Sequence, residues 1–238
     1  VMGPGDQLKI QLLGKVGNSF ELAVGRNGTI NFPELGPISL AGLSFSEAKA
    51  RILEVVSEQM IGVRAVVSLG ELRSIRVFVL GEAFKPGSYT VSALSTMTNA
   101  LFVSGGVKDY GSLRNIQLKR QGKVITSLDL YDLLLKGDTS GDARLQPGDV
   151  IYIPPVGKTA GIEGEVKRPA IYELKGKQNL DALIKLAGGY SSNAYPSVSH
   201  IVRKSQSGFT KVLDLDLKNT NSLKSRLSDG DRVTISSV

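Results

Sequence analysis

Apolar and polar side chains alternate at the start of the chain, where Leu8, Ile10 and Leu12 are separated by polar residues. A period of two residues is that of a β-strand with one buried face. Short apolar runs in the same region predict further strands at 20–24, 29–32, 38–40 and 63–69. The dipeptide Asn27-Gly28 predicts a tight hairpin that joins the strands on either side of it. The opening region is therefore expected to contain several short strands.

One helix is expected among these strands, and its start is marked by Ser44 and Glu47. A serine followed three residues later by a glutamate is typical of a capping box, in which the two residues satisfy each other's backbone N–H groups. Apolar residues then recur at helical spacing, at Ala48, Ile52, Val55 and Val56. We expect this helix to bury its apolar face on the strands and to form with them a first α/β sheet domain, residues 1–72.

The rest of the chain contains one pattern twice. Residues 81–89 and 164–172 share a glycine, a glutamate, a proline and a tyrosine at equivalent places, at an offset of 83 residues. Near the end of the chain, residues 144–149 match residues 226–231 at an offset of 82. Self-similarity at a nearly constant spacing, with length changes only in loops, indicates a duplicated module. We therefore predict two copies of a single domain, at 73–156 and 157–238.

Each copy is expected to contain two strands, a short helix and three more strands. In the first copy the strands fall at 75–80, around Tyr89, and at 116–119, 124–128 and 150–153, with the helix at 97–103. In the second copy they fall at 159–162, around Tyr172, and at 201–204, 211–215 and 233–235, with the helix at 180–187. This order is that of a β-grasp, a mixed sheet curled over one helix. The predicted fold class is α+β, with three small domains in series: an N-terminal α/β sheet domain and two tandem β-grasp domains.

The composition limits the chemistry that the chain can perform. There is no cysteine, which excludes disulfides, thiolate catalysis and cysteine-ligated metal sites. The single histidine, His200, lies beside Ser199, but neighbouring residues on a strand point to opposite faces, so no catalytic dyad is expected. No tryptophan is present to stack a sugar beside paired carboxylates, so we expect no enzyme activity. With one histidine and no cysteine, we also expect no metal, and no cofactor is expected. The alternative is a calcium site made of carboxylates alone, at Asp214 and Asp216 or at Asp229 and Asp231.

The chain carries a net charge of +7, and its excess of basic residues lies towards the end. Residues 158–238 contain thirteen Lys and Arg against eight Asp and Glu, whereas residues 1–70 contain six of each kind. A basic surface favours a polyanionic partner, but nucleic acid is not expected because no aromatic residues interleave with these charges. The candidate contacts to an acidic polysaccharide or to a neighbouring subunit are Lys85, Arg168, Lys119, Arg120, Lys123, Arg203 and Lys204. The alternative is that these side chains lie in solvated loops.

Three motifs in the first domain resemble, in the same order, the polysaccharide-export domain of outer-membrane capsule and exopolysaccharide export proteins. The motifs lie at 3–10, 27–36 and 41–48. The duplicated module is similar to the soluble-ligand-binding β-grasp (SLBB) domain that follows in that family, through residues 79–89, the pair Gly105-Gly106 and residues 147–151. The second copy departs from the motif where Ala170 stands in place of the glycine found at Gly87.

The resemblance implies a role in transport. Members of the family form closed homo-oligomeric rings, so copies of this chain are expected to enclose a wide, polar conduit for a polysaccharide. The implied partner at the inner membrane is a polysaccharide co-polymerase linked to a tyrosine kinase. The implied location is the periplasm, in association with the outer membrane.

The ends of the chain and its hydropathy bear on this expectation. No apolar run approaches the roughly 20 residues of a membrane-spanning helix, and no signal peptide is recognised at the start of the chain, which begins at Val1. We therefore expect a processed protein or a piece of a longer one, with membrane contact only through segments outside this chain. The alternative function is a monomeric β-grasp module that binds a carbohydrate or another soluble ligand.

Overall fold

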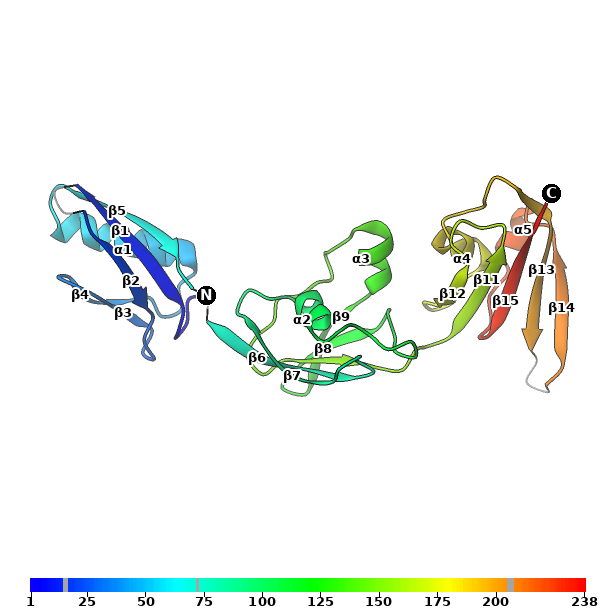
Figure 1. Ribbon diagram of the computed structural model, residues 1–238, viewed down its shortest axis with the longest axis horizontal. Coiled ribbons are helices and arrows are strands. Elements are labelled where there is room, and N and C mark those ends of the chain that lie inside the picture. Colours follow the sequence, from blue (N-terminus) through cyan, green and yellow to red (C-terminus); the bar gives the residue numbers. More distant parts are fainter. Residues whose placement is uncertain (15–16, 72, 205–207) are drawn as a thin grey trace. The chain divides into compact units, whose positions relative to one another are not determined.

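The computed structural model describes residues 1–14, 17–71, 73–204 and 208–238, and its elements are labelled in Figure 1. Contacts between residues divide the chain into two compact units. The first unit consists of residues 1–77 with the segments 90–95 and 144–148, and the second consists of residues 78–89, 96–143 and 149–238. The first unit thus contains the N-terminal domain, and the second contains most of the first β-grasp copy and the whole of the second copy.

The N-terminal domain contains a three-stranded antiparallel sheet, a two-stranded sheet and one helix. The sheets consist of β2 (Ser19–Ala23), β1 (Gln7–Gly14) and β5 (Val63–Leu69), and of β3 (Thr29–Phe32) and β4 (Gly36–Ser39). Leu8, Ile10 and Leu12 on the central strand β1 are buried, as their alternation predicts. They share one hydrophobic core with the buried face of helix α1 (Phe45–Gln59).

Helix α1 begins at the capping box that the sequence predicts. The backbone N–H and the hydroxyl of Ser44 both donate to Glu47 Oε2, at 2.7 Å each, and the backbone N–H of Glu47 donates to Ser44 Oγ at 3.3 Å. These bonds satisfy N–H groups that have no partner within the first helical turn. The start of the helix is therefore fixed by two residues that can be identified from the sequence.

The prediction of a hairpin at Asn27-Gly28 is wrong. A tight turn does form there, in which Gly28 has a φ of 75° and its N–H donates to Gly25 O at 2.9 Å. However, the strands on either side pair with other partners, β2 with β1 and β3 with β4, so they belong to different sheets. The dipeptide fixes only the local backbone, whereas strand pairing is decided by which apolar faces are buried together.

The two β-grasp copies have the same architecture. The strands of the first are β6 (Ser74–Gly81), β7 (Gly87–Ser92), β8 (Ile116–Arg120), β9 (Lys123–Leu128) and β10 (Val150–Ile153). The strands of the second are β11 (Thr159–Gly164), β12 (Ala170–Glu173), β13 (Ala194–Lys204), β14 (Thr210–Leu215) and β15 (Asp231–Ser237). Their orders are β7-β6-β10-β8-β9 and β12-β11-β15-β13-β14, and the pairs β6–β10 and β11–β15 are parallel. Each strand thus has its equivalent five strands later, and the predicted duplication and α+β fold class are confirmed.

Each sheet is accompanied by two short helices, of which the sequence predicts only one. The predicted helices are α2 (Met97–Val103) and α4 (Leu180–Leu186), and the additional ones are α3 (Leu130–Lys136) and α5 (Thr220–Leu223). Helix α3 begins where the Asp129 carboxylate accepts the N–H of Tyr131 at 3.0 Å, and it ends at Gly137, with a φ of 70°. Leu130, Leu133 and Leu134 have helical spacing, but α3 has only seven residues, and so short an apolar run does not distinguish a helix from a strand.

Strand β13 is longer than predicted, because it begins at Ala194 rather than at residue 201. Its pairing with β15 shifts register between Ala194 and Ser199. Pro196 lies in this interval and has no N–H to donate, so the strand does not form a regular ladder there. Among the described residues, no helix is long and apolar enough to cross a membrane.

Two glycines stand at equivalent places where the first strand of each copy ends. Gly81 and Gly164 have φ values of 80° and 79°. A Cβ atom at either position would lie 2.1 Å from a backbone oxygen, that of Ile153 or that of Ile235. Only glycine combines this left-handed backbone with so close an approach to a neighbouring strand.

Replacing Gly81 by alanine is expected to lower the free energy of unfolding of the first copy by about 2–3 kcal/mol, because the steric clash adds to backbone strain. Urea unfolding followed through the amide NMR signals of this copy measures the loss. Gly87→Ala is the matched control, since a Cβ at Gly87 meets nothing within 4 Å and the equivalent residue of the second copy is Ala170. An equal loss in the two variants would contradict this account of Gly81.

Candidate functional site

The seven predicted contact residues lie at opposite ends of the β-grasp sheets. In the first copy, β10 begins beside Lys119 of β8 and ends beside Gly81 of β6. The β8–β9 hairpin, with Arg120 and Lys123, therefore lies at the end where β10 begins, whereas Lys85 follows β6 and lies beyond the other end. The second copy has the same arrangement, with Arg203 and Lys204 at one end and Arg168 at the other. Within one copy, the structure does not bring the two groups together.

Two of these residues, Arg120 and Arg203, hold a buried carboxylate inside their own copy. Arg120 donates from Nε and Nη2 to the two oxygens of Asp149, at 2.7 and 2.8 Å. Arg203 donates from the same atoms to Asp231, at 2.8 and 2.7 Å. Both aspartates are fully buried, and the bonds to them raise the pKa of each arginine. Such two-point ion pairs are strong and account for both arginines within the fold, so their contact with polysaccharide or another subunit stays a prediction.

The other five predicted residues are less engaged with their own copy. Lys119 Nζ lies 4.2 Å from the centroid of the Tyr152 ring, which is a cation–π contact. Arg168 donates from Nη2 to Leu186 O, at 3.1 Å, where α4 ends. The other three of the five, Lys85, Lys123 and Lys204, are exposed. These five side chains are the more available for a partner, and their role as contacts stays a prediction.

The structure places the residues that were considered for catalysis and for metal binding in local contacts within the fold. Ser199 is buried, and its Oγ donates to Pro196 O at 3.4 Å, while the neighbouring His200 is partly exposed. Asp231, weighed for calcium, is occupied by its ion pair with Arg203. Within the described parts of the chain, no three His, Cys, Asp or Glu side chains come together to hold a metal.

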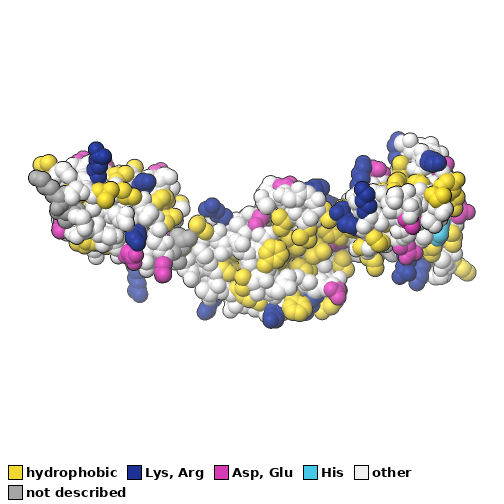
Figure 2. Space-filling view, turned by 45° about the horizontal axis from the view of Figure 1, so that its top comes forward, with side chains coloured by type: hydrophobic (Ala, Val, Ile, Leu, Met, Phe, Trp, Pro, Cys, Tyr) yellow, Lys and Arg dark blue, Asp and Glu magenta, His cyan; other side chains and the backbone are white. Residues whose placement is uncertain are grey.

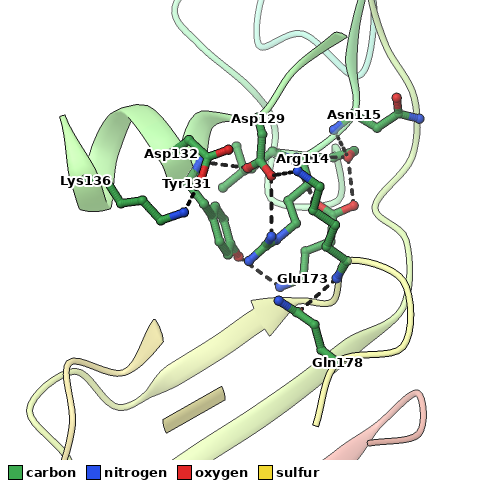
Figure 3. Close-up of polar contacts among 11 residues, drawn as sticks. Arg114, Asn115, Asp129, Tyr131, Asp132, Lys136, Glu173 and Gln178 are labelled. Atoms are coloured by element: carbon green, nitrogen blue, oxygen red, sulfur yellow. Dashed lines mark hydrogen bonds and ion pairs between the residues drawn. The ribbon is translucent and has the colours of Figure 1, made fainter. Parts of the chain in front are cut away.

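The junction between the two β-grasp copies contains a buried carboxylate that no sequence motif indicates. Glu173 ends β12 and is 6% exposed. Its oxygens accept from Ser112 Oγ at 2.7 Å and from the backbone N–H groups of Leu113 and Arg114 at 2.9 and 3.2 Å, all in the first copy. A further donor is the N–H of Gly157, at 2.9 Å, where the second copy starts. One carboxylate is thus surrounded by donors from both copies (Figure 3).

Tyr131 of α3 adds contacts from the first copy to the same junction. Its phenolic oxygen accepts the backbone N–H of Glu173 at 2.9 Å, and its ring packs edge-on against Tyr172, with 6.2 Å between the ring centroids. The guanidinium of Arg114 lies over the Tyr131 ring, 4.1 Å from its centroid (Figure 3). Burial raises the pKa of the Tyr131 phenol, so the group stays neutral at physiological pH.

Charged side chains border this polar cluster. Asp129 Oδ2 lies 3.4 Å from Arg114 Nη1 and 3.0 Å from Lys175 Nζ, which links α3 to the second copy. At the repeat offsets of 83 and 85 residues, Glu173 corresponds to Thr90 and Arg114 corresponds to Ser199. The junction therefore uses positions at which the two copies differ, but the copies differ at many other positions as well, so the sequence alone does not single it out.

Three family models match parts of this chain. The family described as Polysaccharide biosynthesis/export protein matches residues 1–70, and SLBB domains match residues 75–153 and 159–211. Among curated relatives, the polysialic acid transport protein KpsD of Escherichia coli is 30% identical over 177 residues, which is 74% of this chain and 32% of that protein. The EPS I polysaccharide export outer membrane protein EpsA of Ralstonia solanacearum is 28% identical over 201 residues, which is 82% of this chain and 53% of that protein.

These matches confirm the resemblance to polysaccharide export proteins and the series of one N-terminal domain followed by two SLBB domains. The chain spans about a third of the length of KpsD and about half of the length of EpsA. The domain boundaries placed after residues 72 and 156 stay predictions.

Replacing Arg203 by methionine is expected to lower the free energy of unfolding of the second copy by about 3 kcal/mol, because Asp231 stays buried and loses a two-point ion pair. Urea unfolding followed through the amide signals of β15 measures the change. Lys204→Met is the matched control, since Lys204 is the exposed neighbour of Arg203. If Arg203→Met is as stable as the control, the arginine does not hold the fold and its role lies outside the copy.

Replacing Glu173 by alanine is expected to free the two β-grasp copies from each other, because its buried donors lose their acceptor at about 1–3 kcal/mol each. Nuclear spin relaxation of backbone ¹⁵N measures this: one correlation time for both copies before the change and two afterwards. Glu163→Ala is the control, since Glu163 is exposed and bonds Thr234 within its own sheet. A single correlation time in Glu173→Ala would show that other contacts hold the junction.

Proposed function

We propose that this chain, which belongs to the polysaccharide biosynthesis/export proteins with SLBB domains, is the periplasmic part of an outer-membrane polysaccharide exporter. Copies of the chain form a closed ring, and the polysaccharide passes through its lumen. The N-terminal domain faces a polysaccharide co-polymerase of the inner membrane. The names of the relatives support the export role, since KpsD is named for transport of polysialic acid and EpsA for polysaccharide export at the outer membrane.

The observation that carries the ring is that each β-grasp sheet has two different outer strands. They are β7 and β9 in the first sheet and β12 and β14 in the second, where the end of β12 at Glu173 is already bound to Tyr131 of the first copy. An outer strand presents a row of backbone N–H and C=O groups that can pair with a strand of another chain. Because the two edges of one sheet differ, one edge can meet the other edge of the next subunit. This head-to-tail contact closes into a ring when the rotation between subunits allows it.

Exposed apolar side chains accompany these outer strands. Val124 and Ile125 on β9 are 55% and 51% exposed, and Ile171 on β12 and Val212 on β14 are 70% and 59% exposed. The pairing of β9 with β8 shifts register at Val124 and Ile125, so an irregularity of the outer strand accompanies their exposure. Figure 2 shows apolar side chains gathered on the visible surface of the first copy. Exposed apolar side chains on outer strands favour burial of those strands against another protein.

A ring of this kind works by geometry rather than by chemistry. A wide and hydrated lumen lets a long glycan slide, whereas tight contacts would slow its departure from each site and stall it. No bond is made or broken in this process, so the proposal needs no catalytic residue. The matched family and relatives are likewise named for export or transport.

The absence of cysteine makes the edge contact directly testable. In the full-length exporter, produced in its host without other cysteines, Ser88→Cys on β7 is combined with Val124→Cys on β9. Oxidation is expected to join neighbouring subunits into a ladder of covalent oligomers that ends at one closed size. The two cysteines are too far apart to join within one chain, since four strand spacings amount to about 19 Å and a disulfide needs Cα atoms within about 7 Å.

Ile61→Cys combined with Val124→Cys is the control, because Ile61 is 96% exposed but lies outside the β-grasp sheets. It is expected to give no ladder. Only monomers after oxidation of the edge pair would contradict the ring and favour a monomeric carbohydrate- or ligand-binding module. Only dimers would also contradict it, because they indicate a two-fold contact that cannot extend around a ring.

A further inference from the structure

A cavity of about 200 Å³ lies beside the junction of the two β-grasp copies. Its wall combines residues of α3 with residues of α4 and of the turn between β11 and β12. The basic side chains of the wall are Arg114, Lys136, Arg168 and Lys185, and the acidic one is Asp132. The wall therefore carries more basic than acidic side chains, and three of the four cations form ion pairs with Asp129, Asp132 and Asp181.

Three of the four cations are exposed and make only weak contacts within the chain. Lys136 and Lys185 each pair with an aspartate one helical turn away, at 2.6 Å, and exposed pairs of this kind contribute little stability. Arg168 donates to Leu186 O at 3.1 Å, and among the described residues its guanidinium has no other hydrogen-bond partner. Since a guanidinium carries five donors, Arg168 keeps most of them for a ligand.

The fourth cation, Arg114, is buried, and its side chain is 8% exposed. Its Nε and Nη2 atoms have no hydrogen-bond partner among the described residues, whereas in Arg120 and Arg203 the same two atoms hold a carboxylate. The ion pair of Arg114 with Asp129 is long, at 3.4 Å, and Asp129 is shared with Lys175. Two donor atoms of Arg114 are therefore left without a partner among the described residues.

An anionic group is the ligand that this arrangement fits. Arginine and lysine bind carboxylates through charge-assisted hydrogen bonds. The volume lies below the roughly 300–1,000 Å³ of sites for drug-sized molecules, so the cavity suits one charged group at a time. We propose that it binds the carboxylate of a single acidic sugar residue. Arg168 and Lys185 contact the carboxylate, and Arg114 adds positive potential from the buried wall.

This proposal deepens the export role and rests on it for the source of the sugar, which is one residue of an acidic polysaccharide. A passing chain must leave the cavity again, so the binding of one residue is expected to be weak. For a single sugar acid the dissociation constant is expected on the order of 1 mM.

An NMR titration of the chain tests the cavity with three probes: sodium glucuronate, glucose and inorganic phosphate. Glucuronate and glucose differ by the carboxylate, so glucuronate is expected to shift amide signals of α3 and α4 saturably, and glucose is not. An equal response to glucose would overturn the proposal. Phosphate binding about tenfold or more tighter than glucuronate would also overturn it, because the cavity would then be a site for a free anion.

Two variants and one control test which residues hold the carboxylate. Arg168→Gln and Lys185→Gln are each expected to weaken glucuronate binding about five- to tenfold, through loss of a charge-assisted contact. Both side chains are exposed, so the fold is retained. Lys167→Gln is the matched control, since Lys167 is the exposed neighbour of Arg168 and does not line the cavity. Equal weakening by Lys167→Gln would show unspecific attraction to the net positive charge and would overturn the proposal.

Failure of this proposal is distinguishable from failure of the conduit. If glucuronate binds at the cavity but the cysteine pair on β7 and β9 forms no ladder, the chain is an acidic-sugar-binding module and not a ring. If the ladder forms and glucuronate does not bind, the conduit stands and the acidic-sugar site is withdrawn.

Discussion

The buried carboxylate of Glu173 is the contact on which the relation between the two β-grasp copies depends. A charge removed from water is stable only where donors surround it, and Glu173 has four of them at 2.7 to 3.2 Å. Three belong to the segment that leads into β8, and one belongs to the start of the second copy. The carboxylate therefore fixes two segments at once, and the cavity with the positive wall is formed beside this contact.

The two copies share the contacts that hold each sheet and differ in the contacts that join them. The pairs Arg120–Asp149 and Arg203–Asp231 occupy equivalent places and use the same atoms. At the junction, by contrast, Glu173 corresponds to Thr90 in the other copy. Both copies of the duplicated module thus keep the internal ion pair, while the junction is made by residues at which the copies differ.

Most of the fold could be predicted from the sequence, because local residue patterns indicate the strands and helices. The alternation on β1, the capping box of Ser44 and Glu47 and the repeat offset led to the right strands, the right start of α1 and two equivalent sheets. The dipeptide Asn27-Gly28 did not predict which strands pair on either side of the turn, because strand pairing depends on which apolar faces are buried together. Helix α3 was missed because its seven residues form a short apolar run, which does not distinguish a helix from a strand.

The residues of the site could be predicted from the sequence less well than the fold. Charge alone pointed to Arg120 and Arg203, but a surplus of basic residues does not tell an arginine that binds a buried aspartate from one that faces a partner. It did point to Arg168, which lines the cavity. Arg114 and Glu173 depend on contacts between segments about 60 residues apart, and no spacing in the sequence encodes such a contact.

The free edges of the two sheets and the fixed junction between them together describe a subunit that can repeat around an axis. Electron cryo-microscopy of the full-length exporter in its membrane tests this most directly. The account predicts closed rings in which each β-grasp copy forms one layer and in which the lumen is continuous. Isolated monomers, two-fold dimers or open filaments would contradict it.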